Sequence, residues 1–110
     1  MIAGVITGGR DQARILFRGI GPSLESNGIP LSDRLQDPTL ELHDANGSLL
    51  AANDNWKDTE QIEIIQSSLA PIDDREAAIV GDYPPGTYTV ILRGKNNTTG
   101  IGLIEVYKLN

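Results

Sequence analysis

Oxygen-bearing side chains gather in the middle of this sequence, where together they could bind a hard cation. They are Asp44, Asn46, Asn53, Asp54, Asn55, Asp58, Asp73 and Asp74. Calcium takes roughly six to eight oxygen ligands from carboxylates, side-chain amides and backbone carbonyls, which these residue types supply. The set therefore predicts a structural Ca²⁺ site, provided that folding brings its members together.

The same residues also suit a purely structural role. Counted from Asp44, Gly47 falls at the fourth place and Asn55 at the twelfth, whereas an EF-hand needs glycine at the sixth place and glutamate at the twelfth. Asp and Asn side chains commonly close turns and cap helices by bonding to nearby backbone groups. A calcium site outside the EF-hand class and simple turn closure are therefore both open interpretations.

Catalytic constellations are absent from the sequence. It holds no cysteine and a single histidine, His43, so a nucleophile relay or a zinc set cannot be completed. Asp73 and Asp74 are adjacent, and adjacent side chains on an extended segment point apart, whereas glycosidase carboxylates face each other across a cleft. We therefore expect no enzymatic activity.

Trp56 stands among the polar residues and admits two interpretations. A large aromatic side chain in a small domain usually contributes buried area, so we expect Trp56 to cover the core. The alternative is a carbohydrate-binding accessory module of a secreted enzyme, in which Trp56, Tyr83 or Tyr88 stacks on a polysaccharide.

Charge and hydropathy exclude two classes of partner. The chain carries 15 acidic and 9 basic residues, for a net charge of −6, and a negative surface repels phosphate backbones. No apolar run approaches the ~20 residues that span a bilayer. We expect neither a nucleic-acid partner nor membrane insertion. We expect Arg14, Arg18 and Arg93 to pair across strands with Glu41 or Glu105, and the alternative is that these arginines line an anion-tolerant face.

The elements that must position these residues are short strands. Runs rich in β-branched and aromatic residues alternate with turn signals, which is typical of an all-β sandwich. The predicted strands are Ile2–Thr7, Ala13–Arg18, Thr39–Asp44, Ser48–Asn53, Glu76–Val80, Thr87–Arg93 and Ile101–Lys108. Apolar and polar residues alternate within Thr39–His43, so one face of that strand should be buried.

One segment has helical rather than strand periodicity. Asp58-Thr59-Glu60-Gln61 resembles a capping box with Asp58 as the cap, and Ile62, Ile65 and Leu69 follow at helical spacing. We expect a short helix that ends before Pro71 and covers an open end of the sandwich with this apolar stripe. The whole pattern predicts one domain over residues 1–110, an antiparallel, jelly-roll-like β-sandwich of about seven or eight strands with one short covering helix.

Several segments together carry a family resemblance. They are Ile15–Leu24, Asp37–Asp44, Asn53–Trp56, Leu69–Pro71 with Asp73–Glu76, Pro85–Thr89 and Gly100–Tyr107. Nearly the whole chain resembles a module repeated in long bacterial surface and secreted proteins, related to the pre-peptidase C-terminal (PPC-like) β-sandwiches.

The resemblance implies a non-catalytic structural or adhesion module, extracellular or on the cell surface, that acts as a spacer or as an assembling repeat. It implies neighbouring copies of the module, or other domains of a longer chain, as partners. It also implies calcium at Asn53, Asp54 and Asn55. Because a helix follows this stretch directly, the capping role expected for Asp58 competes with a ligand role. An exposed terminal strand such as Ile2–Thr7 can pair with a neighbouring module.

Overall fold

The described part of the chain folds into seven strands. The computed structural model describes residues 1–9, 11–24 and 28–109. The strands are β1 (Ile2–Thr7), β2 (Ala13–Ile20), β3 (Pro38–His43), β4 (Leu49–Asn53), β5 (Ala77–Tyr83), β6 (Gly86–Gly94) and β7 (Leu103–Lys108). Each predicted strand is present with its ends shifted by a few residues at most, and the predicted all-β fold is confirmed.

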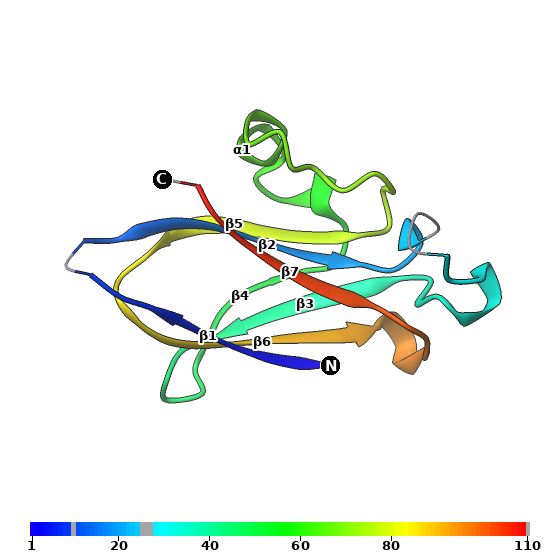
Figure 1. Ribbon diagram of the computed structural model, residues 1–110, viewed down its shortest axis with the longest axis horizontal. Helices are drawn as coiled ribbons and strands as arrows, with labels where there is room; N and C mark the ends of the chain where they lie inside the picture. The colour runs from blue at the N-terminus through cyan, green and yellow to red at the C-terminus, as the bar shows by residue number, and fades with distance from the viewer. Residues whose placement is uncertain (10, 25–27, 110) are drawn as a thin grey trace.

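These strands form two facing sheets. One has four strands in the order β1-β6-β3-β4, and the other has three in the order β5-β2-β7. Every pair of neighbouring strands is antiparallel. Figure 1 shows the two sheets as layers, with the three-stranded sheet above the four-stranded one. The molecule is therefore an antiparallel β-sandwich, as the strand pattern predicted.

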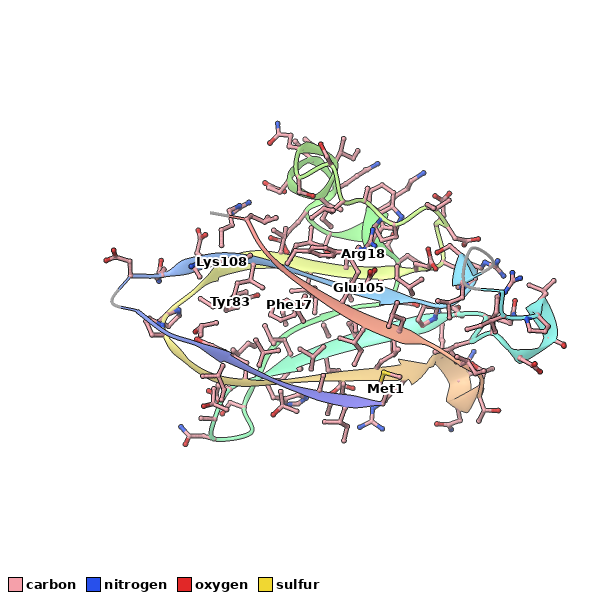
Figure 2. The ribbon with its side chains drawn as sticks, viewed as in Figure 1. Met1, Phe17, Arg18, Tyr83, Glu105 and Lys108 are labelled. Carbon is pink, nitrogen blue, oxygen red and sulfur yellow. The ribbon has the colours of Figure 1, made fainter. Side chains whose placement is uncertain are left out.

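The main core lies between the two sheets. Leu40 and Leu42 on β3 are buried while their neighbours are half-buried, so the alternation seen in the sequence does mark an inward face. Phe17 and Tyr83 point into the same layer (Figure 2), with their rings edge to face at 5.9 Å between centroids. Such aromatic contacts add to the area that the core removes from water.

A second, smaller core covers the outer face of the three-stranded sheet. Helix α1 (Gln61–Gln66) and the 3₁₀ turn η3 (Trp56–Asp58) lie over that sheet, above β5 and β2 in Figure 1. Leu16 on β2 is fully buried there, beside the fully buried Ile64 on α1. Strand β2 is thus apolar on both faces because it is covered on both sides. Two further 3₁₀ turns, η2 (Leu31–Asp33) and η4 (Lys95–Asn97), connect strands.

The predicted helix exists and ends before Pro71, but its cap and its buried face were wrong. The helix begins at Gln61 after Glu60, which has a left-handed φ of 51°, and Asp58 belongs to η3 instead. Ile62 and Ile65 are 69% and 52% exposed. The helix also covers a sheet face rather than an open end of the sandwich, because the chain crosses from β4 to that face before the helix starts.

Candidate functional site

The eight predicted ligands come from three segments of the chain, namely the turn between β3 and β4, the end of β4 with the residues after it, and the residues before β5. Asp44 and Asn46 belong to the turn between β3 and β4, where the Asp44 carboxylate accepts hydrogen bonds from the backbone N–H groups of Asn46 and Ser48, both at 2.9 Å. Gly47 takes the positive φ of 82° that closes this turn. Asp44 therefore has a complete structural role in the hairpin.

Asn53 acts as a bridge between the two sheets. Its side chain is buried at the end of β4, and its Nδ2 donates to the Asn55 carbonyl at 3.0 Å and to the Thr59 hydroxyl at 2.9 Å. Its Oδ1 accepts from the backbone N–H of Ala78 on β5 at 3.0 Å. A buried amide with its groups satisfied in this way stabilises the crossing from β4 to η3.

Asp54 takes part in a pair of carboxyl groups with Asp37, which sequence reasoning did not include among the ligands. Asp54 Oδ2 is 2.7 Å from Lys95 Nζ. The Oδ1 atoms of both Asp37 and Asp54 are buried, and neither has a hydrogen-bond partner in the described residues. Burial, and then the nearby charge of Asp54, raise the pKa of Asp37, while Lys95 and Arg75 lower it.

The remaining acidic residues of the predicted set are Asp58, Asp73 and Asp74, and the last two bind basic side chains. Asp58 is exposed in η3. The Asp73 carboxylate binds Arg75, with the guanidinium Nε at 3.0 Å, and this hydrogen bond lowers the pKa of Asp73. Asp74 Oδ1 is 2.9 Å from Lys57 Nζ. Within the described ranges, no group of three or more His, Cys, Asp or Glu side chains is placed to hold a metal ion.

Glu76 is a buried charged residue whose structural role was not predicted from the sequence. It is fully buried, and its Oε2 accepts hydrogen bonds from the backbone N–H groups of Gly21 at 2.9 Å and Ser23 at 3.0 Å. Its Oε1 accepts from the N–H of Asp73 at 3.1 Å. One carboxylate thus fastens the turn after β2 to the start of β5. The available signal was an acidic first residue in the otherwise apolar predicted strand Glu76–Val80.

Cross-strand pairing of the arginines is confirmed. On the outer face of the three-stranded sheet, Arg18 is bound to Glu105, with its Nε at 3.0 Å from Oε1, and its guanidinium lies 5.3 Å from the Tyr107 ring centroid. Figure 2 shows Arg18 and Glu105 close together. On the other sheet Arg93 is 3.4 Å from Glu41. In each pair a carboxylate balances the arginine charge, and Arg18 and Glu105 together line a small hollow of about 170 Å³.

His43 shares the Glu41 carboxylate with Arg93. Its Nε2 is 3.0 Å from Glu41 Oε1 and its Nδ1 is 3.2 Å from the Gly47 carbonyl. The hydrogen bond to Glu41, and then the one to Gly47, raise the pKa of His43. The ring is half-buried, because these two contacts hold it against the hairpin.

The aromatic side chains do not offer an exposed stacking surface. Trp56 is 5% exposed, as is Tyr88, which confirms the expectation that Trp56 covers the core. Tyr83 is half-buried, and its ring lies edge to face with that of Tyr88. Burial raises the pKa of Tyr83. None of the three residues proposed for sugar stacking presents an open ring face.

Two hollows open where the sheets part beside β1. One of about 260 Å³ is lined by Val5, Ile6, Ile15, Val106 and Lys108, among others. A second of about 430 Å³ lies near Met1 and the chain between β6 and β7. Val106 is on the inward face of β7, opposite Phe17 on β2, and is still 41% exposed. The sandwich is therefore incompletely closed on this side.

Comparison with protein-family models, with curated proteins and with solved structures finds no match for this chain. The resemblance to PPC-like modules accordingly stays a prediction. No helix in the described residues is long and apolar enough to cross a membrane.

Proposed function

We propose that this protein is a non-catalytic structural module, extracellular or on the cell surface, that acts as a spacer or as a repeat assembling with neighbouring copies or other domains. The extracellular setting is taken from the resemblance to PPC-like modules. The assembling role is supported by the molecule itself, through the chemistry of two edge strands.

The supporting observation is that exposed aliphatic side chains collect on the two edges of one sheet. Ile2 and Ile6 on β1 are 70% and 82% exposed, and Leu49 and Leu50 on β4 are 58% and 44% exposed. Neither strand contains a charged residue or a proline. Proteins that must stay single usually protect a strand edge with charge, proline, a bulge or a covering segment. Of these devices β4 has one irregularity in its pairing with β3, opposite Leu42 and His43, and neither strand has charge or proline. Two uncharged apolar edges therefore favour a protein that works by contact with another protein.

Calcium stabilisation stays a prediction. Of the predicted ligands, Asp54 presents a buried oxygen without a hydrogen-bond partner in the described residues, and Asp37 contributes a second one. Asp44, Asn53 and Asp73 already bind backbone or side-chain groups. A cation effect is therefore expected at the Asp37–Asp54 pair rather than across all eight residues. Polysaccharide binding also stays a prediction, without an exposed aromatic among its three candidates.

The assembling role is tested by sedimentation velocity of the purified chain from roughly micromolar to millimolar concentrations. We expect the average mass to rise with concentration, because burial of exposed aliphatic area favours association. A chain that stays monomeric over the whole range would overturn the assembling-repeat role.

A further inference from the structure

The edge strands of the two sheets differ in how far they are covered or charged. The outer edge of β5 is covered, because Asn53 Oδ1 accepts from the Ala78 N–H at 3.0 Å and the Trp56 N–H donates to the Glu76 carbonyl at 2.9 Å. The outer edge strand β7 carries two charged residues, Glu105 and Lys108. Both devices are ways in which proteins prevent pairing between edges. Strands β1 and β4 carry no charged residue and, in the described residues, no pairing strand on their outer sides. The pairing of β4 with β3 is irregular at one point, where Leu42 lies opposite Ala51 and His43 opposite Leu49, and the rest of the β4 edge is regular.

The directions of the strands make these two edges complementary. In the order β1-β6-β3-β4 each strand is antiparallel to the next. With four alternating strands, β4 runs opposite to β1. A second molecule displaced sideways along the sheet, without rotation, would therefore place its β1 antiparallel to β4 of the first. The antiparallel pattern would continue across the junction without interruption.

The side chains also match in this arrangement. Val5 pairs opposite Tyr88, and Ala51 opposite Leu42, so both face the core side of the sheet. Ile2 and Ile6 on β1 belong to the outer side of the sheet. Leu49 on β4 lies opposite His43 on β3 and also belongs to the outer side. Sideways displacement keeps the two sides of the sheet in register. Aliphatic side chains would meet aliphatic ones on the outer side, as stable cross-strand pairs require.

We infer that β4 of one molecule pairs antiparallel with β1 of a second copy, so that the four-stranded sheet continues from molecule to molecule. The inference rests on the proposed function and names its contact surface. A second copy is the occupant because one molecule carries both members of the complementary pair, strands of six and five residues with uncharged, apolar edges. Since the contact joins two different surfaces, each added copy leaves one edge free and growth is open-ended.

Three matched double variants test the inference by sedimentation velocity. Ile2→Lys/Ile6→Lys blocks the β1 edge and Leu49→Lys/Leu50→Lys blocks the β4 edge. The control, Ile62→Lys/Ile72→Lys, adds the same charge at positions that are 69% and 87% exposed and lie on neither edge. We expect each edge variant to weaken self-association by roughly tenfold or more, and the control to associate like the wild type.

Mixing the two edge variants distinguishes this contact from other modes. The β1 variant keeps an intact β4, and the β4 variant keeps an intact β1, so an equimolar mixture should form a one-to-one dimer that grows no further. Circular dichroism checks that every variant is folded. Association of the wild type that survives in both folded edge variants, or a mixture without dimer, would overturn the β1–β4 contact and leave the proposed function standing. A wild-type chain that never associates would overturn the assembling-repeat role of the proposed function together with the β1–β4 contact.

Discussion

Single buried polar groups hold distant parts of this chain together. Glu76 joins the turn after β2 to the start of β5, across 55 residues of sequence. Asn53 joins the end of β4 to β5. Asp37 and Asp54 instead bring two acidic groups close, with Lys95 as the balancing cation. The cost of leaving a buried charged or polar group unsatisfied makes these few positions more sensitive than most of the surface.

Replacement of Glu76 by glutamine should destabilise the protein strongly. The amide keeps one acceptor oxygen but turns an NH₂ group toward backbone N–H donors of Gly21, Ser23 or Asp73. We expect Glu76→Gln to lower the free energy of unfolding by about 2–4 kcal/mol, measured by urea denaturation. Glu63→Gln on the exposed side of α1 is the matched control. Equal stability of the two variants would contradict the bridging role of Glu76.

Replacement of Asp37 by asparagine should stabilise the protein at neutral pH, whereas Glu76→Gln should destabilise it. Burial and the charge of Asp54 raise the pKa of Asp37 above its ordinary value of 3.8. The folded state therefore binds this proton more tightly than the unfolded state, and the associated stability is present below the unfolded pKa and lost as pH rises through the folded pKa. We expect Asp37→Asn to be more stable than the wild type at neutral pH and similar to it near pH 3.

The comparison is made by urea denaturation at both pH values, with Asp11→Asn at an exposed position as the control. A neutral-pH gain that appears equally in the control would assign the effect to net charge. A loss of stability in Asp37→Asn at neutral pH would contradict the repulsion described here.

At the scale of elements, helix α1 is positioned by the segment before it. Its six residues are too few for hydrophobic spacing alone to select a face. The 3₁₀ turn η3 and the left-handed Glu60 set the direction in which the helix starts. Ile64 consequently points at the sheet, and Ile62 and Ile65 point to solvent. The spacing of apolar residues predicted the element, and the preceding contacts decided its orientation.

Two alanine substitutions in α1 test this orientation. Ile64 is fully buried beside Leu16 and Trp56, whereas Ile62 is 69% exposed. We expect Ile64→Ala to lower the free energy of unfolding by about 2–4 kcal/mol, and Ile62→Ala to change it by no more than about 0.5 kcal/mol. Denaturation followed by Trp56 fluorescence reports on the same cluster. A larger loss of stability in Ile62→Ala than in Ile64→Ala would instead support the buried face predicted from the spacing, which contains Ile62 and Ile65.

At the scale of the whole molecule, the unequal sheets explain its surface. Four strands face three, so the inward side of β7 stays partly open beside β1, where Val106 is 41% exposed. In the three-stranded sheet, β5 has backbone groups covered by Asn53 and Trp56, and β7 carries charged residues. The uncharged edge strands β1 and β4 belong to the four-stranded sheet. Self-association is thus expected to depend on the edge strands β1 and β4, and stability on the two cores and on the buried bridges at Asn53 and Glu76.

The calcium prediction is tested on the whole domain by thermal melts with excess chelator and with millimolar calcium. A ligand at a hundredfold its Kd stabilises the native state by about 2.7 kcal/mol, and each kcal/mol moves the Tm of a ~100-residue domain by about 4–8 °C. The prediction expects an upward shift that Asp54→Asn removes and Asp74→Asn, at the exposed pair with Lys57, retains. Equal Tm values with chelator and with calcium would contradict the calcium site and leave the eight residues with structural roles only.

Sequence patterns alone were enough for the all-β class, the seven strands and the burial of Trp56. These features depend on the conformational preferences of neighbouring residues and on alternation along one strand, which are local properties of the chain. Cross-strand pairing of Arg18 was also predicted, with Glu41 or Glu105 as the partner, and the strand order selected Glu105.

Only the tertiary structure decided which polar groups meet. Asp37 joined Asp54, Glu76 joined Gly21 and Ser23, Asp44 closed its own turn and Asp73 bound Arg75. It also decided that β1 and β4 are the edges of one sheet. These outcomes depend on the order of strands across the sheets, and many strand orders are compatible with the same local pattern of alternating residues.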